Sequence, residues 1–205
     1  SASEILQDTN NSDQRLKLLN ILNHDVQRIE RLITDYSQML KDEVALSKEK
    51  MKKINIEPII QSVVDDYNSI YKVKKDIKIN YEDDGKKEYS INGIENRIEQ
   101  MIANLLDNSI SFTEKGGKII VNISISSNRK ITVKIIDEGQ GFKEKDTSKI
   151  FRRFYSNRPD KFGEHSGLGL NIVKNLVELH DGKILASNRP NNKGAIIEIS
   201  FPSMQ

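Results

Sequence analysis

The chain has 205 residues, of which 32 are basic and 30 acidic, so its formal net charge is only +2. Such a balance does not favour a nucleic-acid or anionic-membrane surface as the main binding face. The absence of cysteine excludes disulfides, thiol nucleophiles and zinc–thiolate sites. No apolar run approaches the about 20 residues that span a bilayer, and the sequence does not begin with methionine. We therefore expect a portion of a longer protein, with any membrane segment lying outside it.

The N-terminal part of the chain predicts one long helix, Asp13–Lys53. Its apolar residues recur at spacings of three and four, with charged residues between them. These apolar residues are Leu19, Leu22, Val26, Ile29, Ile33, Tyr36 and Leu40. Such a stripe needs a partner helix, either in its own domain or in a second copy of the chain, and we favour a homodimer. Because Ala2–Leu6 predict the end of a preceding helix, residues 1–53 would form a partial antiparallel helical hairpin.

From residue 54 onward the pattern changes to alternating strands and helices. One helix begins near Pro58, since proline suits a first helical turn, and two more are predicted at Ile94–Phe112 and Leu168–His180. The predicted strands are Ile77–Tyr81, Glu88–Asn92, Lys118–Ile125, Lys130–Asp137, Lys183–Ser187 and Ala195–Phe201. Helices on one side of a mixed sheet make a two-layer α/β sandwich, so the expected fold class of residues 54–205 is α+β.

Three short motifs carry candidate chemistry, and the first is a pair of asparagines. Asn104 and Asn108 lie one turn apart on the helix Ile94–Phe112, so their side chains share one face. Neutral carboxamides can hold a hydrated Mg²⁺ and phosphate oxygens without adding negative charge. Taken alone, the pair is also compatible with ordinary exposed or capping asparagines.

The second motif follows the strand Lys130–Asp137. Asp137 ends this strand, and Gly139 and Gly141 form a tight turn directly after it. A flat ligand can slide past glycines, and a buried carboxylate beside them can accept a hydrogen bond from an amino group. An ordinary turn remains the alternative for this motif in isolation.

The third motif is a glycine-rich loop that leads into the helix Leu168–His180. It consists of Ser166, Gly167, Leu168, Gly169 and Leu170. Glycines at a helix N-terminus allow backbone N–H groups to reach phosphate, with help from the helix dipole. The loop matches neither the P-loop pattern nor the G-x-G-x-x-G pattern of dinucleotide-binding proteins.

In this order, the three motifs resemble the N, G1 and G2 boxes of the histidine-kinase ATPase domain, a Bergerat-type fold of the gyrase, Hsp90, histidine kinase and MutL superfamily. The run Ile150–Tyr155 resembles the F box, and Gly194 the last glycine position. The resemblance covers residues 54–202. The runs Phe151–Gly169 and Leu18–Tyr36 are especially similar to the alphaproteobacterial ChvG-like sensor kinases.

The resemblance implies a role for each matching residue. Asn104 would ligate Mg²⁺, Asn108 would hold phosphates, and Asp137 would read the adenine amino group of ATP. Phe142–Ser166 would be a lid over the nucleotide, with Arg153 as a candidate contact to phosphate. The remaining candidates for nucleotide binding are Gly139, Gly141, Ser166, Gly167, Leu168, Gly169 and Leu170.

The resemblance also implies a reaction, ATP-dependent phosphorylation of a protein histidine in two-component signalling. Asn104 cannot act as a general base, which disfavours the gyrase-like and MutL-like ATPases, whereas a neutral imidazole is itself a nucleophile. An anti-sigma-factor-type serine kinase and a catalytically inactive binding module remain as alternatives.

The acceptor histidine is expected upstream of the chain. His24 is followed by Asp25, as in the family, but Ile29 stands where the family has proline. His24 also lies on the helix that immediately precedes the ATPase domain, whereas the family's acceptor lies on the first of two helices. Residues 1–53 would thus be part of the dimerisation and histidine-phosphotransfer region, and 54–205 the catalytic domain, unable to phosphorylate itself alone.

The expected partners follow from the same resemblance. They are a response-regulator receiver domain and a second copy of the chain, with no nucleic acid. The parent protein would be a sensor in the bacterial inner membrane, attached through segments outside this sequence, and the chain would be part of its cytoplasmic portion.

Overall fold

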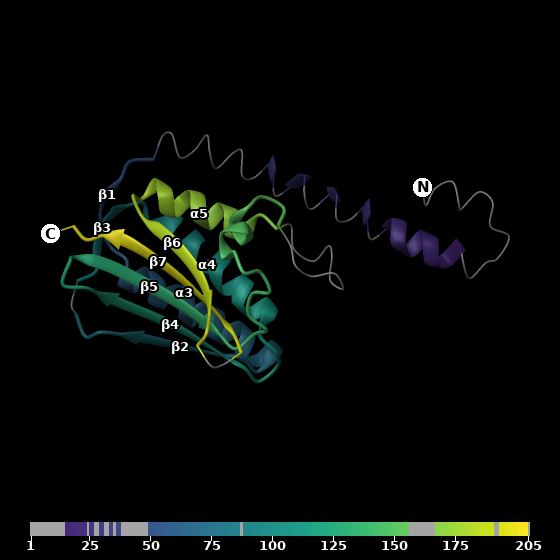
Figure 1. Ribbon diagram of the computed structural model, residues 1–205, viewed down its shortest axis with the longest axis horizontal. Coiled ribbons are helices and arrows are strands. Elements are labelled where there is room, and N and C mark those ends of the chain that lie inside the picture. The colour runs from purple at the N-terminus through teal and green to yellow at the C-terminus, as the bar shows by residue number, and fades with distance from the viewer. Residues whose placement is uncertain are drawn as a thin grey trace. The chain divides into compact units, whose positions relative to one another are not determined.

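The computed structural model describes residues 15–23, 25–26, 29–30, 33–34, 36–37, 49–86, 88–155, 167–190 and 193–204. The larger of two compact units comprises Glu49–Tyr155 and Gly169–Gln205 (Figure 1). The described residues between 15 and 37 belong to the other unit and are helical. On this helix Leu19 is 46% exposed and Ile33 61% exposed, so most of the described part of the predicted apolar stripe is exposed. Dimerisation through it stays a prediction.

The prediction of helix up to Lys53 is wrong at its end. Residues 49–51 are irregular, and strand β1, Lys52–Asn55, pairs antiparallel with strand β3, Ser90–Gly93. Two residues of the segment at alternating positions, Ile54 and Ile56, are buried in the core. Pairing with a distant strand and burial of these isoleucines therefore outweigh the helix propensity of the lysines before them.

The main sheet combines the remaining strands of the described residues. It has five strands in the order β2-β4-β5-β7-β6, in which β2 and β4 are parallel and the other neighbours antiparallel. Strands β4 and β5 have the predicted bounds, because apolar residues alternate along their full length. The strands are β2 Lys78–Asp83, β4 Lys118–Ile125, β5 Lys130–Asp137, β6 Lys183–Asn188 and β7 Ala195–Pro202.

Helices pack on one face of this sheet. Helix α3, Glu57–Lys75, contacts β2, and helix α4, Glu95–Phe112, contacts β5. Helix α5, Gly169–Leu179, packs beside α4, and a short 3-10 helix η1, Thr147–Phe151, contacts both α5 and β6 (Figure 1). The core lies between helices and sheet, so the predicted two-layer sandwich is confirmed.

Helices α4 and α5 run antiparallel, which sets the geometry of the candidate site. At one end, the buried His180 directly after α5 accepts a hydrogen bond on Nε2 from the backbone N–H of Ile94, at 3.2 Å. At the other end, a Cβ built at Gly169 would lie 3.7 Å from Oδ1 of Asn104. The beginning of α5 therefore faces the middle of α4.

Candidate functional site

The asparagine pair lies on the half-buried side of α4. Six apolar residues form the buried side of this helix, next to the face on which Asn104 and Asn108 lie at partial exposure. These apolar residues are Ile98, Met101, Ile102, Leu105, Leu106 and Ile110. The first motif and the third motif meet here, since Gly169 lies next to Asn104.

Asp137 at the end of β5 is a buried carboxylate, with only 5% of its surface exposed. Its Oδ1 accepts hydrogen bonds from the backbone N–H groups of Gly139, at 2.9 Å, and Ala195, at 3.1 Å. Burial raises the pKa of Asp137 above its usual value, while these bonds and one from the Ser109 side chain act in the opposite direction. Because Ser109 follows Asn108 on α4, the first and second motifs also meet.

The turn after Asp137 requires glycine at two positions. A Cβ at Gly139 would lie 2.9 Å from the carbonyl oxygen of Phe112, and one at Gly141 would lie 2.7 Å from Oδ1 of Asn188. Gly141 also has φ +75°, which glycine adopts without strain. The turn can therefore lie against the end of α4 and against β6 only without side chains.

Gly194 makes a comparable approach from β7. Its φ is +130°, and a Cβ there would lie 2.0 Å from the carbonyl oxygen of Asp137. This contact brings the beginning of β7 close enough for the N–H of Ala195 to reach the Asp137 carboxylate. Position 194 therefore requires glycine, because any side chain would collide with the backbone of Asp137.

The glycine-rich loop is described from Gly167 onward, and Ser166 lies outside the described residues. Gly167 has φ +72°, and Leu168 is 1% exposed. Helix α5 begins at Gly169, followed by the half-buried Leu170. The N–H groups of its first turn have no partner inside the helix, as at every helix start, and can bind an anion.

Residues 142–155, the described part of the predicted lid, carry exposed basic side chains after a buried anchor. Ile150 and Phe151 of η1 are buried, whereas Lys149, Arg152 and Arg153 are exposed. Arg153 therefore lies at the surface, two residues after the buried Phe151. His24, the weak acceptor candidate, lies outside the described residues.

Sequence reasoning missed several side chains that shape this region. Asn188 on β6 accepts from the N–H of Phe142 at 2.6 Å and donates to its carbonyl at 2.9 Å. Asn171 on α5 donates to the carbonyl of Phe151 at 2.9 Å. A polar residue in a buried position of an otherwise apolar helix face could have pointed to Asn171, but nothing comparable distinguishes Asn188.

Tyr67 on α3 is a further unpredicted neighbour of the asparagine motif. Its hydroxyl donates to the carbonyl of Ala103 at 3.4 Å, and Asp107, which lies between Asn104 and Asn108 in sequence, is close to it. Burial is the main cause that raises the pKa of Tyr67 above its usual value, and the Asp107 carboxylate adds to the effect. The tyrosine therefore stays protonated at neutral pH, and its hydroxyl joins α3 to the backbone of α4.

Comparison with known proteins matches residues 93–205 to the family described as histidine kinase-, DNA gyrase B- and HSP90-like ATPases. The chain belongs to this ATPase family. The family description implies that the domain binds ATP, and the membership predicted from the three motifs is confirmed.

Two similar curated proteins are sensor proteins. The sensor protein ChvG of Rhizobium meliloti is 34% identical over 208 residues, covering 98% of this chain and 36% of that protein. ChvG of Agrobacterium fabrum is also 34% identical, with 98% and 35% covered. The predicted similarity to ChvG-like kinases is confirmed, and the chain spans about a third of the length of these relatives.

Solved structures of the ATPase family agree with the fold. The catalytic domain of histidine kinase ThkA is 26% identical with a TM-score of 0.64, covering 76% of this chain and 97% of that chain. ThkA in complex with the response regulator protein TrrA is 23% identical with a TM-score of 0.66, covering 100% and 58%, which supports the fold alone. Among the described residues of the present chain, none of the helices combines the length and apolarity needed to cross a membrane.

Proposed function

We propose that this chain is the ATP-binding catalytic part of a sensor protein-histidine kinase. The observation that carries the proposal is the convergence of the three motifs on α4. Ser109 hydrogen bonds with Asp137, and Asn104 lies beside Gly169, so a carboxylate, two carboxamides and a helix N-terminus surround one region.

The residues present fit an adenine nucleotide. Asp137 offers a buried acceptor for an amino group, and the glycines at positions 139, 141 and 194 let the backbone pack closely around it. Asn108, the N-terminus of α5 and Arg153 would bind the phosphates. A bound ATP would supply the phosphoryl group that is transferred.

A magnesium ion would be held mainly by the nucleotide. Among the described residues, no group of three or more histidine, cysteine or acidic side chains could hold a metal ion. Asn104 is the candidate protein ligand, because an amide oxygen binds Mg²⁺ while phosphates and water fill the other positions. The neutral donor set avoids repulsion between a carboxylate and the phosphates.

The amide at position 104 favours phosphoryl transfer to histidine over ATP hydrolysis. An amide does not accept a proton at neutral pH, so water would lack a general base at this position. A neutral imidazole needs no such base, because its ring nitrogen attacks directly. The similarity to ChvG sensor proteins supports the same reading.

The acceptor histidine, the partners and the location are part of this proposal. The acceptor would lie upstream of Ser1, and phosphate would pass to an aspartate of a response-regulator receiver domain. The exposed apolar stripe of the N-terminal helix would pair two copies of the chain. The parent protein would be anchored in the bacterial inner membrane, with this portion on the cytoplasmic side, where ATP is available.

Nucleotide binding is tested by calorimetry with a non-hydrolysable ATP analogue, with and without Mg²⁺. We expect magnesium-dependent binding that Asp137→Asn abolishes, because Oδ1 already accepts two backbone N–H groups and the second oxygen would become an NH₂ donor facing the amino group. Asp83→Asn is the matched control, since Asp83 is exposed and its Oδ1 accepts a turn N–H from Gly85, at 2.6 Å. Equal binding by the Asp137 variant and the control would contradict the proposal.

The reaction is tested by incubating labelled ATP with this chain and with a version extended upstream. We expect acid-labile label on the extended version alone. Acid-stable label would indicate a serine kinase, and hydrolysis without label would indicate an ATPase. Label on His24 of the present chain would refute the upstream placement of the acceptor.

A further inference from the structure

Two side-chain amides anchor opposite ends of the segment 142–151, which connects the glycine turn to the basic residues. Asn188 makes two hydrogen bonds with Phe142 at its beginning, and Asn171 makes one with Phe151 at its end. Between them, the hydroxyl of Thr147 donates to the carbonyl of Ala186 on β6, at 2.7 Å. This part of the predicted lid is therefore attached to β6 and α5 through side-chain bonds to backbone.

We propose that Asn171 is a positioning residue for the phosphate end of the nucleotide site. Its bond to the Phe151 carbonyl fixes η1 to the first turn of α5, whose N-terminus would bind phosphate. The basic residues Arg152 and Arg153 follow Phe151 directly, so the same bond fixes where they leave the body of the domain. This inference rests on the nucleotide binding proposed above.

The environment of Asn171 favours positioning over stability as its role. The side chain is 9% exposed, and its Oδ1 is buried without a hydrogen-bond partner among the described residues. An unsatisfied buried acceptor reduces stability, whereas an apolar side chain would suit the position as it does at Val173 and Leu176. What the amide provides is one directed bond from Nδ2 to Phe151.

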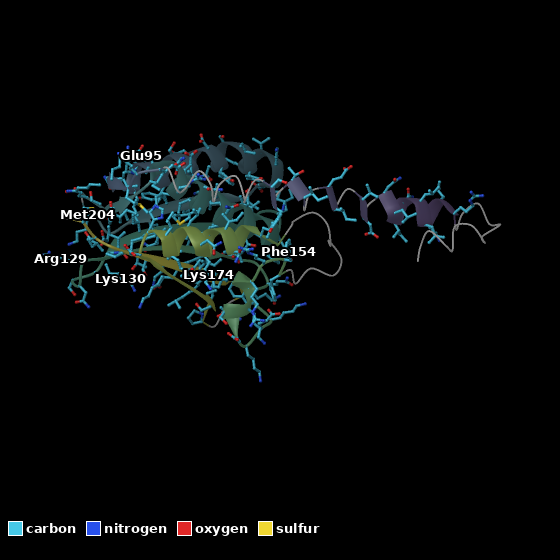
Figure 2. The ribbon with its side chains drawn as sticks, turned by 90° about the horizontal axis from the view of Figure 1, so that it is seen from above. Glu95, Arg129, Lys130, Phe154, Lys174 and Met204 are labelled. Atoms are coloured by element: carbon cyan, nitrogen blue, oxygen red, sulfur yellow. The ribbon has the colours of Figure 1, made fainter. Side chains whose placement is uncertain are left out.

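The turn after Phe151 connects the bond between Asn171 and Phe151 to the position of the two arginines. The N–H of Arg152 donates to the carbonyl of Lys149 at 3.1 Å. The N–H of Tyr155 donates to the carbonyl of Arg152 at 3.3 Å. Phe154 has φ +61°, a left-handed conformation at the third position of this turn. Figure 2 shows Phe154 toward the N-terminal end of α5, where phosphate would bind. The direction of the arginines thus depends on the position of the Phe151 carbonyl.

Asn188 provides a matched contrast, because it is an amide of the same type at the adenine end. Its Oδ1 lies 2.7 Å from the position of a Cβ at Gly141, in the turn that follows Asp137. Loss of its bonds should disturb the turn around the adenine and so affect every adenine ligand. Loss of the Asn171 bond should affect only ligands that carry phosphates.

The experiment measures binding of adenosine and of the magnesium complex of a non-hydrolysable ATP analogue by titration. For Asn171→Ala and the isosteric Asn171→Asp, we expect about tenfold weaker binding of the analogue, equivalent to one lost directed contact, and adenosine affinity within about twofold of the unmodified chain. For Asn188→Ala we expect weaker binding of both ligands. Thermal unfolding of each variant accompanies the titrations.

Each outcome decides between the readings. Analogue binding that is unchanged in both Asn171 variants, or equally weakened for both ligands, would overturn the inference. Failure of both Asn171 variants to fold would overturn it as well, because the residue would then be essential to the core. If the unmodified chain binds neither ligand, the proposed function itself fails.

Discussion

The guanidinium of Arg97 binds both carboxylate oxygens of Glu49, with Nε 3.1 Å from Oε2 and Nη2 3.0 Å from Oε1. Arg97 is in the first turn of α4, two turns before Asn104, and Glu49 lies just before β1. The side chain of Arg97 is 8% exposed and that of Glu49 26%. The first residue of the larger unit, Glu49, is thus bound to helix α4, which carries the candidate magnesium ligand Asn104.

Removal of Glu49 should therefore destabilise the larger unit. In Glu49→Ala the buried Arg97 loses its two hydrogen bonds to Glu49 and keeps that to Gln100, which should lower the free energy of unfolding by about 2 kcal/mol, less than for a fully buried pair. Urea denaturation measures this change. Lys52→Ala is the control, because the Lys52–Glu95 pair is 61% and 59% exposed and should contribute below about 1 kcal/mol. Equal losses in both variants would contradict the prediction.

His180 should make stability dependent on pH. Burial is the main cause that lowers its pKa below 6.5, although the Leu176 carbonyl and Asp181 act in the opposite direction. The unfolded chain therefore binds a proton more readily, and the stability present above pH 6.5 is lost as the pH falls toward the lowered pKa. Unfolding midpoints between about pH 7 and about pH 5 should fall more steeply for the unmodified chain than for His180→Gln. Parallel curves would contradict this assignment.

Gly194→Ala should be severely destabilising. The new Cβ would lie 2.0 Å from the Asp137 carbonyl, at a φ of +130° that alanine rarely adopts. We expect a loss of about 3 kcal/mol or more in chemical denaturation. Gly85→Ala is the control, since φ is +72° but no described atom lies within 4 Å of its Cβ. Backbone strain alone should cost that variant about 1 kcal/mol.

Asn104→Ala should remove the magnesium dependence of nucleotide binding. If Asn104 ligates the ion, calorimetry should show about tenfold weaker binding with Mg²⁺ and little change in the presence of a chelator. Asn92→Ala, at an exposed position of β3, should behave like the unmodified chain under both conditions. A similar loss of nucleotide affinity with and without Mg²⁺ would show that Asn104 shapes the site and does not ligate the ion.

The sequence alone determined the elements whose pattern is local. Strands β4 and β5 were predicted with their bounds, because Ile119, Val121 and Ile123 alternate with polar or half-buried neighbours. Helix α4 was predicted to begin one residue earlier than it does, at Ile94. The order of the asparagines, the aspartate and the glycines was sufficient to predict the family. This was possible because each motif is contiguous in the chain.

Only the tertiary structure decided which side chains meet. The end of the N-terminal helix was mispredicted because β1 exists through pairing with the distant β3, which no local period reveals. The bonds of Ser109 to Asp137, of Asn171 to Phe151 and of Asn188 to Phe142 likewise join residues on different elements. Periodicity reports which face of an element is buried, whereas the partner of a polar group depends on how the elements pack.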